Sequence, residues 1–252
     1  MMNTILIAIT ISACLISVVL LGMRLRLLLP DNQMTPDTKE TVKLAMGLVA
    51  TMTALLLGLL VSSAKSAYDT TRDEVIAMAA KVSYLDGLLT AYGAEASNAR
   101  ALLRAGIETA VRGMWPERRA EGVRLAPDAQ TGHALYAAIQ ELTPQDELQR
   151  GLKAQAAGLA VELRQLRYLL LVQSVSSISR PLLWVVVSWL LMIFLSFSVL
   201  APSNATARAA LIAAALSVSG AIFLILEFDR PFSGVMQIPS DPIKNAVGQV
   251  LK

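Results

Sequence analysis

The 252-residue sequence has few of the residue types that form catalytic and metal sites. Cys14 is its one cysteine and His133 its one histidine, so it has no internal disulfide and no Cys/His cluster with metal-ligand spacing. It also has no glycine-rich phosphate loop and no evident serine, histidine and aspartate set. We therefore expect no cofactor, no bound metal and no enzymatic activity, and we interpret His133 as a surface or packing residue.

Charged residues are scarce as well. They make up 16% of the chain, against about 25% in an average soluble domain, whereas 55% of the residues are hydrophobic. The net charge of +3 is spread along the sequence, without the basic patch of a nucleic-acid-binding protein. With a mean hydropathy of +0.56, the composition indicates a membrane protein that does not bind nucleic acid.

Four long segments carry no charge. They are Asn3–Met23, Leu44–Ala64, Pro181–Leu200 and Ala209–Leu226. Because a helix needs about 20 apolar residues to cross a bilayer, we predict four transmembrane helices. Both termini then lie on one side of the membrane together with the segment 65–180. The distribution of Lys and Arg does not fix the orientation, and we favour the cytoplasm for that side.

The second uncharged segment has a regular pattern. Its small residues recur every three or four positions and share one helical face: Gly47, Thr51, Ala54, Gly58 and Ser62. Lys43 and Lys65 flank the segment, and bulky leucines occupy the rest of it. A face of small residues allows close packing between transmembrane helices, or it lines a narrow ion path. We favour packing, which leaves the Leu and Met side as the better candidate for a constriction.

The segment between the second and third spans is predicted to be helical. Its first helix continues the second span as one rod of about 50 residues and stops at Gly93. Further helices are expected over Glu95–Arg112, His133–Leu142 and Pro144–Val175, the last with Thr143 as its N-cap. The polar stretch 117–128 is expected to be a loop. The predicted division is thus 1–64 and 181–227 for the membrane helices, 65–180 for a helical soluble domain, and 228–252 for a tail.

A distinctive motif follows the fourth span. It comprises Glu227, Asp229, Arg230, Pro231, Phe232 and Gly234. One interpretation is structural: Asp229 pairs with Arg230, Pro231 ends the helix, and Phe232 anchors the chain at the interface. The other interpretation is a structured collar around a conduction path. The two are compatible, and the residues alone do not choose between them.

This motif also carries a resemblance. The run Asp-Arg-Pro-Phe-Ser-Gly at 229–234, the second-span run 42–55 and the run 217–227 are similar to the bestrophin-like family of bacterial four-span membrane proteins. The resemblance covers essentially the whole chain. It implies an all-α, multi-pass protein of the bacterial inner (plasma) membrane, with a helical cytoplasmic domain inserted between the second and third spans. Its partners would be membrane lipid, small inorganic anions and further copies of the chain.

A more distant similarity, in topology and in the Pro-Phe-Ser-Gly sequence, connects this family with the bestrophin anion channels. That similarity implies a pentameric channel for anions such as chloride, with the second span lining the pore. A hydrophobic neck with steps of four would comprise Met52, Leu56 and Leu60, although Leu48 with Met52, and Leu55 with Leu59, have the same spacing. Lys43 and Lys65 would concentrate anions at the pore mouths. The acidic calcium-binding run of animal bestrophins is replaced by 235–240, which makes calcium gating doubtful.

Two other functions remain open at the level of sequence. Stator-type proton channels of molecular motors share the four-span topology with a large insert. They work around a second protein that carries the proton-binding acid, and no acidic residue lies within a span here except Glu227, at an edge. A non-conducting scaffold or sensor would instead bind a soluble partner through its helical domain. A ring of five copies would favour a channel, and a dimer would favour a scaffold.

Overall fold

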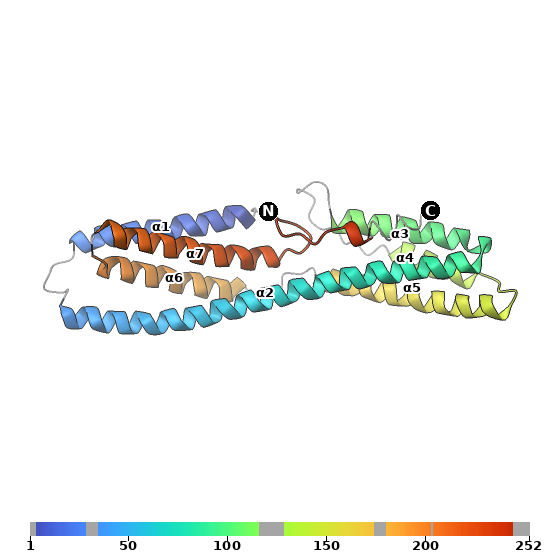
Figure 1. Ribbon diagram of the computed structural model, residues 1–252, viewed down its shortest axis with the longest axis horizontal. Coiled ribbons are helices and arrows are strands. Elements are labelled where there is room, and N and C mark those ends of the chain that lie inside the picture. Colours follow the sequence, from blue (N-terminus) through green and yellow to red (C-terminus); the bar gives the residue numbers. More distant parts are fainter. Residues whose placement is uncertain (1–3, 29–34, 116–128, 174–179, 203, 244–252) are drawn as a thin grey trace. The chain divides into compact units, whose positions relative to one another are not determined.

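The computed structural model describes residues 4–28, 35–115, 129–173, 180–202 and 204–243. All the regular elements within these ranges are helices (Figure 1), which confirms the all-helical prediction for this part of the chain. The chain divides into two compact units. The first unit contains residues 1–67 and 176–229, and the second contains residues 68–175 and 230–252. The predicted loop 117–128 lies outside the described residues.

The first unit is built from four apolar helices. They are α1 (Thr4–Leu28), the first part of α2 (Pro36–Tyr92), α6 (Arg180–Leu200) and α7 (Ala205–Phe228). Each is long and apolar enough to cross a membrane, as the four uncharged segments predicted. α1 packs against both α6 and α7. The buried residues that hold the unit together include Leu15, Leu60, Phe194 and Ile222, one from each helix.

Close helix contact in this unit depends on one glycine. A Cβ atom added at Gly22 of α1 would lie 2.6 Å from the Cβ of Ser198 on α6 and 3.1 Å from the carbonyl oxygen of Leu195. No side chain fits in that space, so glycine allows the two backbones to approach as small residues do between membrane helices.

The apolar helices extend beyond the uncharged segments. α1 continues through Arg24 and Arg26 to Leu28, and α7 includes Arg208 in its first turn. α7 begins after Asn204, whose side-chain oxygen accepts a hydrogen bond of 2.8 Å from the backbone N–H of Ala207. Arginine does not end a helix, because its long side chain can carry the charge toward water. The uncharged core of a span is therefore shorter than the helix that contains it.

α2 contributes to both units. It has 57 residues, somewhat more than the predicted length of the rod, because it starts at Pro36 rather than near Lys43. Proline suits the first turn of a helix, and the Thr35 hydroxyl accepts a hydrogen bond of 3.3 Å from the N–H of Thr38. α2 ends at Tyr92, where Gly93 follows with φ of 119°. The predicted stop at Gly93 is thus confirmed.

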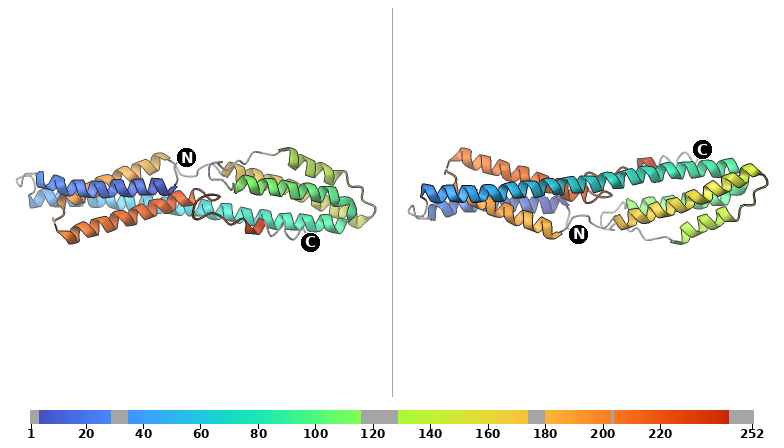
Figure 2. Two further views of the ribbon diagram at one scale, coloured as in Figure 1. Left: turned by 90° about the horizontal axis from the view of Figure 1, so that it is seen from above. Right: turned by 90° about the horizontal axis from the view of Figure 1, so that it is seen from below.

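The second unit packs α3 (Ser97–Met114), α4 (Ala129–Gln140) and α5 (Glu147–Gln173) with the second part of α2, after a 3₁₀ turn at Ala94–Ala96 (Figures 1 and 2). Its core contains Leu85 and Leu89 of α2, Leu103 of α3 and Ile139 of α4. Asp86, which is 7% exposed, accepts two hydrogen bonds from Arg100 of α3, at 2.9 and 3.2 Å. These bonds raise the pKa of the Arg100 guanidinium above its ordinary value.

The start of α5 differs from the prediction. The helix begins at Glu147 and not at Pro144, so the assignment of Thr143 as N-cap is wrong. The cap is Asp146, whose carboxylate accepts a hydrogen bond of 2.6 Å from the N–H of Gln149. Lys153 then donates to the carbonyl oxygens of Gln140 and Leu142, at 2.7 and 2.8 Å. These bonds satisfy one carbonyl at the end of α4 and one just after it, and so they hold the link between α4 and α5 against α5.

Candidate functional site

The membrane portion of α2 has one face that the chain itself does not cover. Its bulky apolar residues on that side are 49–71% exposed: Leu44, Leu48, Met52, Leu55 and Leu59. The opposite side of the same helix packs into the first unit through Thr53, Leu60 and Ala64, which are at most 5% exposed. One chain therefore uses half of this helix for its own core and leaves the other half for lipid or for another chain.

The three predicted neck residues do not share one environment. Met52 is 49% exposed, Leu56 is partly buried, and Leu60 is 5% exposed in the core of the first unit. The physical reason is the helical repeat. A step of four residues advances by about 40° around an α-helix, so two such steps from Met52 reach the packed side at Leu60.

The stripe of small residues lies beside the uncovered leucines. A Cβ atom added at Gly47 or Gly58 would meet nothing within 4 Å, and Thr51, Ala54 and Ser62 are exposed. The Thr51 hydroxyl donates a hydrogen bond of 3.0 Å to the carbonyl oxygen of Gly47 on its own helix. Its proton is therefore already used, which weakens the hypothesis that this hydroxyl donates to a passing anion.

The two lysines that flank the segment are both exposed. The Lys65 Nζ lies 6.0 Å from the ring centroid of Phe228 at the end of α7, a distance at which the cation is attracted to the ring face. This contact ties the end of the apolar part of α2 to α7 and fixes where the positive charge of Lys65 is held. Lys43 directly precedes Leu44, the first of the uncovered leucines.

The motif after the fourth span is divided between the two units. Glu227 is 1% exposed in the last turn of α7, and Asp229 ends that helix with its N–H donating to the Ile225 carbonyl oxygen. Arg230, Pro231, Phe232 and Gly234 belong to the second unit.

The residues 230–243, which we call the post-span segment, pack against the second unit. Phe232 is 4% exposed and meets the ring of Trp115 edge to face, with centroids 5.4 Å apart. The Trp115 indole N–H donates a hydrogen bond of 2.8 Å to the Ile238 carbonyl oxygen, and the Ile238 N–H donates to the Pro231 carbonyl oxygen at 2.7 Å. Phe232 thus lies in the core of a helical unit rather than serving as an exposed interfacial anchor.

Sequence reasoning missed this contact. The sequence alone assigns residues 228–252 to a tail and gives Trp115 no role. One feature of the sequence could have suggested a contact: each of two short segments pairs a proline with a large aromatic residue, Trp115-Pro116 and Pro231-Phe232. Nothing in the sequence shows that these segments meet, since they are more than a hundred residues apart.

The described part of the chain has four apolar helices of membrane-spanning length, one of which, α2, has an uncovered face. These features are those of a helical membrane protein. A comparison with models of protein families identifies the family. The model of the bestrophin-like domain matches residues 13–243, so the chain belongs to the bestrophin-like family. No curated protein and no solved structure matches the sequence. In the described part of the chain, no three His, Cys, Asp or Glu side chains come together in a way that could hold a metal ion.

Proposed function

We propose that this chain forms a homo-oligomeric channel for small anions such as chloride, with α2 lining the pore. The observation that carries the proposal is the uncovered half of α2. In one chain, a stripe of small residues and a stripe of large apolar residues lie next to each other on that helix, and neither is packed. Membership of the bestrophin-like family supports a channel rather than an enzyme.

Each stripe suits a different position in a ring of subunits. A face with Gly47 and Gly58 allows α2 of a neighbouring copy to approach closely. The adjacent Leu and Met stripe then faces the axis, where large apolar side chains form a constriction that controls conduction by dewetting. Five copies are the number that the resemblance to bestrophins implies.

The exposures refine the position of the proposed neck. Met52 remains a proposed neck residue, because about half of its surface is exposed within one chain. Leu48, Leu55 and Leu59 join it, since they are 61–71% exposed on the same side. Leu60 would have to leave the core of the first unit to reach the pore, so we assign it to packing.

Electrostatics in this arrangement favours anions. The segment Leu44–Ala64 contains no acidic residue, and Lys43 and Lys65 place a positive charge at each end of it. Repeated around a ring, these charges raise the local concentration of anions at both mouths of the pore. The proposed setting is the bacterial inner membrane, with both termini and the second unit in the cytoplasm.

Flux from liposomes tests the proposal. The purified protein is reconstituted, chloride and sodium gradients are applied in turn, and the oligomer mass is measured on the same sample. We expect chloride flux without sodium flux, from a ring of five. Proton flux would favour the stator-type alternative, and a silent dimer would favour a scaffold; either result would overturn the channel proposal.

A further inference from the structure

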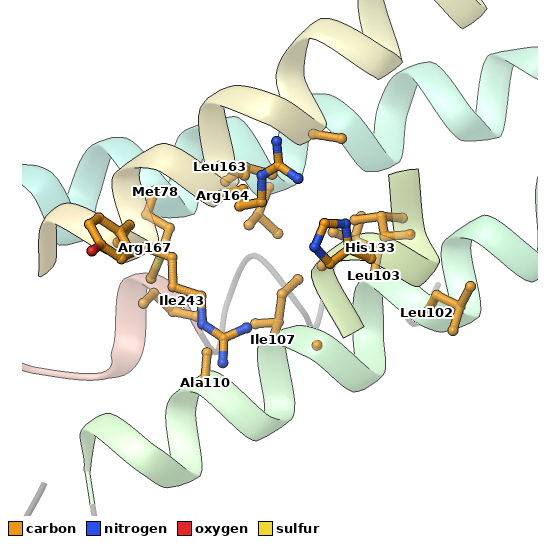
Figure 3. A pocket seen from close by; sticks show the side chains of 16 residues that line it. Met78, Leu102, Leu103, Ile107, Ala110, His133, Leu163, Arg164, Arg167 and Ile243 are labelled. Atoms are coloured by element: carbon orange, nitrogen blue, oxygen red, sulfur yellow. The ribbon is translucent and has the colours of Figure 1, made fainter. Parts of the chain in front are cut away.

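The second unit contains a cavity that the proposed pore does not use. Its volume is about 280 Å³, and it lies between α3, α4 and α5, with Met78 and Val82 of α2 and Ile243 of the post-span segment completing the wall (Figure 3). Most of the wall is apolar. The space is open on one side rather than fully enclosed, so a small ligand can enter it and bury its apolar part against the wall.

The polar side chains around this cavity are cationic or can donate hydrogen bonds. Arg164 and Arg167 lie three residues apart on α5 and therefore on one face of that helix. His133 joins them from α4, and Tyr168 from α5. The described residues that line the cavity include no aspartate and no glutamate.

Arg167 is the key residue at this cavity. Its Nε atom is buried and has no hydrogen-bond partner among the described residues. In Figure 3 its guanidinium lies beside Ile107 and Ala110 of α3, and the His133 ring borders the same space. A buried donor on a charged group is costly without a partner. A guanidinium is also the side chain best suited to bind a carboxylate or phosphate with two parallel hydrogen bonds.

We propose that this cavity binds an amphipathic anion, with a carboxylate or phosphate head at Arg167, the positive charge of Arg164 on another part of the wall (Figure 3), and a short apolar chain against the wall. The volume lies just below the roughly 300–1,000 Å³ typical of ligand pockets, which favours a medium-length chain over a full-length lipid. The inference is independent of the pore, because every residue that carries it lies in the second unit.

Equilibrium binding tests this site on the full-length protein in nanodiscs of zwitterionic lipid, with empty nanodiscs subtracted. The probes are hexanoate, octanoate and decanoate, then octyl and decyl phosphate, with decanol as the uncharged analogue. We expect saturable binding that strengthens by about fourfold per added methylene. Decanol should bind about tenfold or more weakly than decanoate. The two acid series show whether the site takes a carboxylate or a phosphate head.

Variants connect the binding to the cavity. Arg167→Gln should weaken decanoate by about tenfold and leave decanol unchanged, since only the head contact is lost. Arg164→Gln removes the other positive charge of the cavity, at a more exposed position, and should weaken decanoate by a smaller factor; it keeps the test available if Arg167→Gln does not fold. Arg150→Gln, on the same helix but outside the cavity, should bind decanoate as the unaltered protein does. Ala160→Phe should weaken acid and alcohol alike by filling the space.

Two results would overturn the proposal. One is the absence of saturable binding above that of empty nanodiscs. The other is an equal affinity for decanoate in the Arg167→Gln, Arg164→Gln and Arg150→Gln variants when all three retain their helical circular-dichroism spectrum.

Discussion

The two parts of α2 show how differently one helix can be used. In the second unit one apolar face of α2 is inside the protein, with Val75 and Leu85 fully buried and Leu89 1% exposed. In the first unit only 11% of its most apolar window is buried. Both parts are hydrophobic, so the difference lies in what covers them. A unit in water, as proposed for the second unit, must cover its apolar face within the chain, whereas a unit in the membrane can leave a face for lipid or for another subunit.

Truncation of one leucine in each part of α2 should give the largest difference in stability between the two environments. Leu85→Ala, at a fully buried position, should destabilise the second unit by about 2–5 kcal/mol, because it removes packed atoms and leaves a cavity. Leu55→Ala, at a position 71% exposed, should change the stability of the single chain by less than about 0.5 kcal/mol. Denaturant unfolding in mild detergent measures both. Equal losses would mean that the α2 face is packed within the chain.

A second pair of variants tests packing inside the first unit. Gly22→Ala should cost about 1–3 kcal/mol, since the added methyl would overlap Ser198 of α6. Gly220→Ala on α7 is the matched control, because its Cβ would meet nothing within 4 Å, and it should be neutral or slightly stabilising. Thermal melts of the two variants in one detergent give the comparison. A tolerated Gly22→Ala would contradict the close crossing of α1 and α6.

The charged pair of the second unit should have a smaller effect. Asp86→Asn weakens the two-bond contact with Arg100 and should cost about 1–2 kcal/mol. Glu147→Gln breaks the ion pair with Arg150. The Arg150 side chain is 61% exposed and that of Glu147 is 86% exposed, so water screens the pair and its loss should cost less than about 0.5 kcal/mol. Denaturation midpoints distinguish the two variants. A larger loss of stability for Glu147→Gln than for Asp86→Asn would mean that the exposed pair, and not the pair of Asp86 with Arg100, stabilises the second unit.

The smallest effect on the chain itself is expected at the small-residue stripe. Gly58→Leu should leave the stability of one subunit almost unchanged, because nothing lies within 4 Å of the added Cβ. It should nevertheless lower the oligomer mass, since the bulky side chain keeps a neighbouring α2 away. Gly220→Leu is the control on α7, which is equally open. Mass photometry that shows the same assembly for both variants would remove the stripe from the subunit interface.

The helices were largely predictable from sequence, because periodicity and hydropathy are local properties. The four apolar helices and the stop of α2 at Gly93 are confirmed. The cap of α5 was missed, since Thr143 and Asp146 are both good N-caps and the choice between them depends on the turn that Lys153 closes. Family membership was also predictable from the motifs around 229–234.

The site was less accessible to sequence reasoning. The resemblance to bestrophins, with its steps of four residues, put Met52, Leu56 and Leu60 together, whereas the direction in which each points depends on the core that α2 shares with its neighbours. The contact of Trp115 with Phe232 and the cavity at Arg167 arise from residues far apart in the chain. Such long-range pairings cannot be read from local patterns.

Thiol accessibility distinguishes a pore lined by α2 from a pore lined by another helix. In a Cys14→Ser background, Met52→Cys and Leu216→Cys are compared, because both side chains are about half exposed on apolar helices. A charged, membrane-impermeant thiol reagent reacts with thiolates in water and not with thiols in lipid. We expect the reagent to block chloride flux through Met52→Cys liposomes and to leave the flux through Leu216→Cys liposomes unchanged. Equal sensitivity of the two variants, or a reagent-insensitive flux through Met52→Cys, would contradict a pore lined by α2.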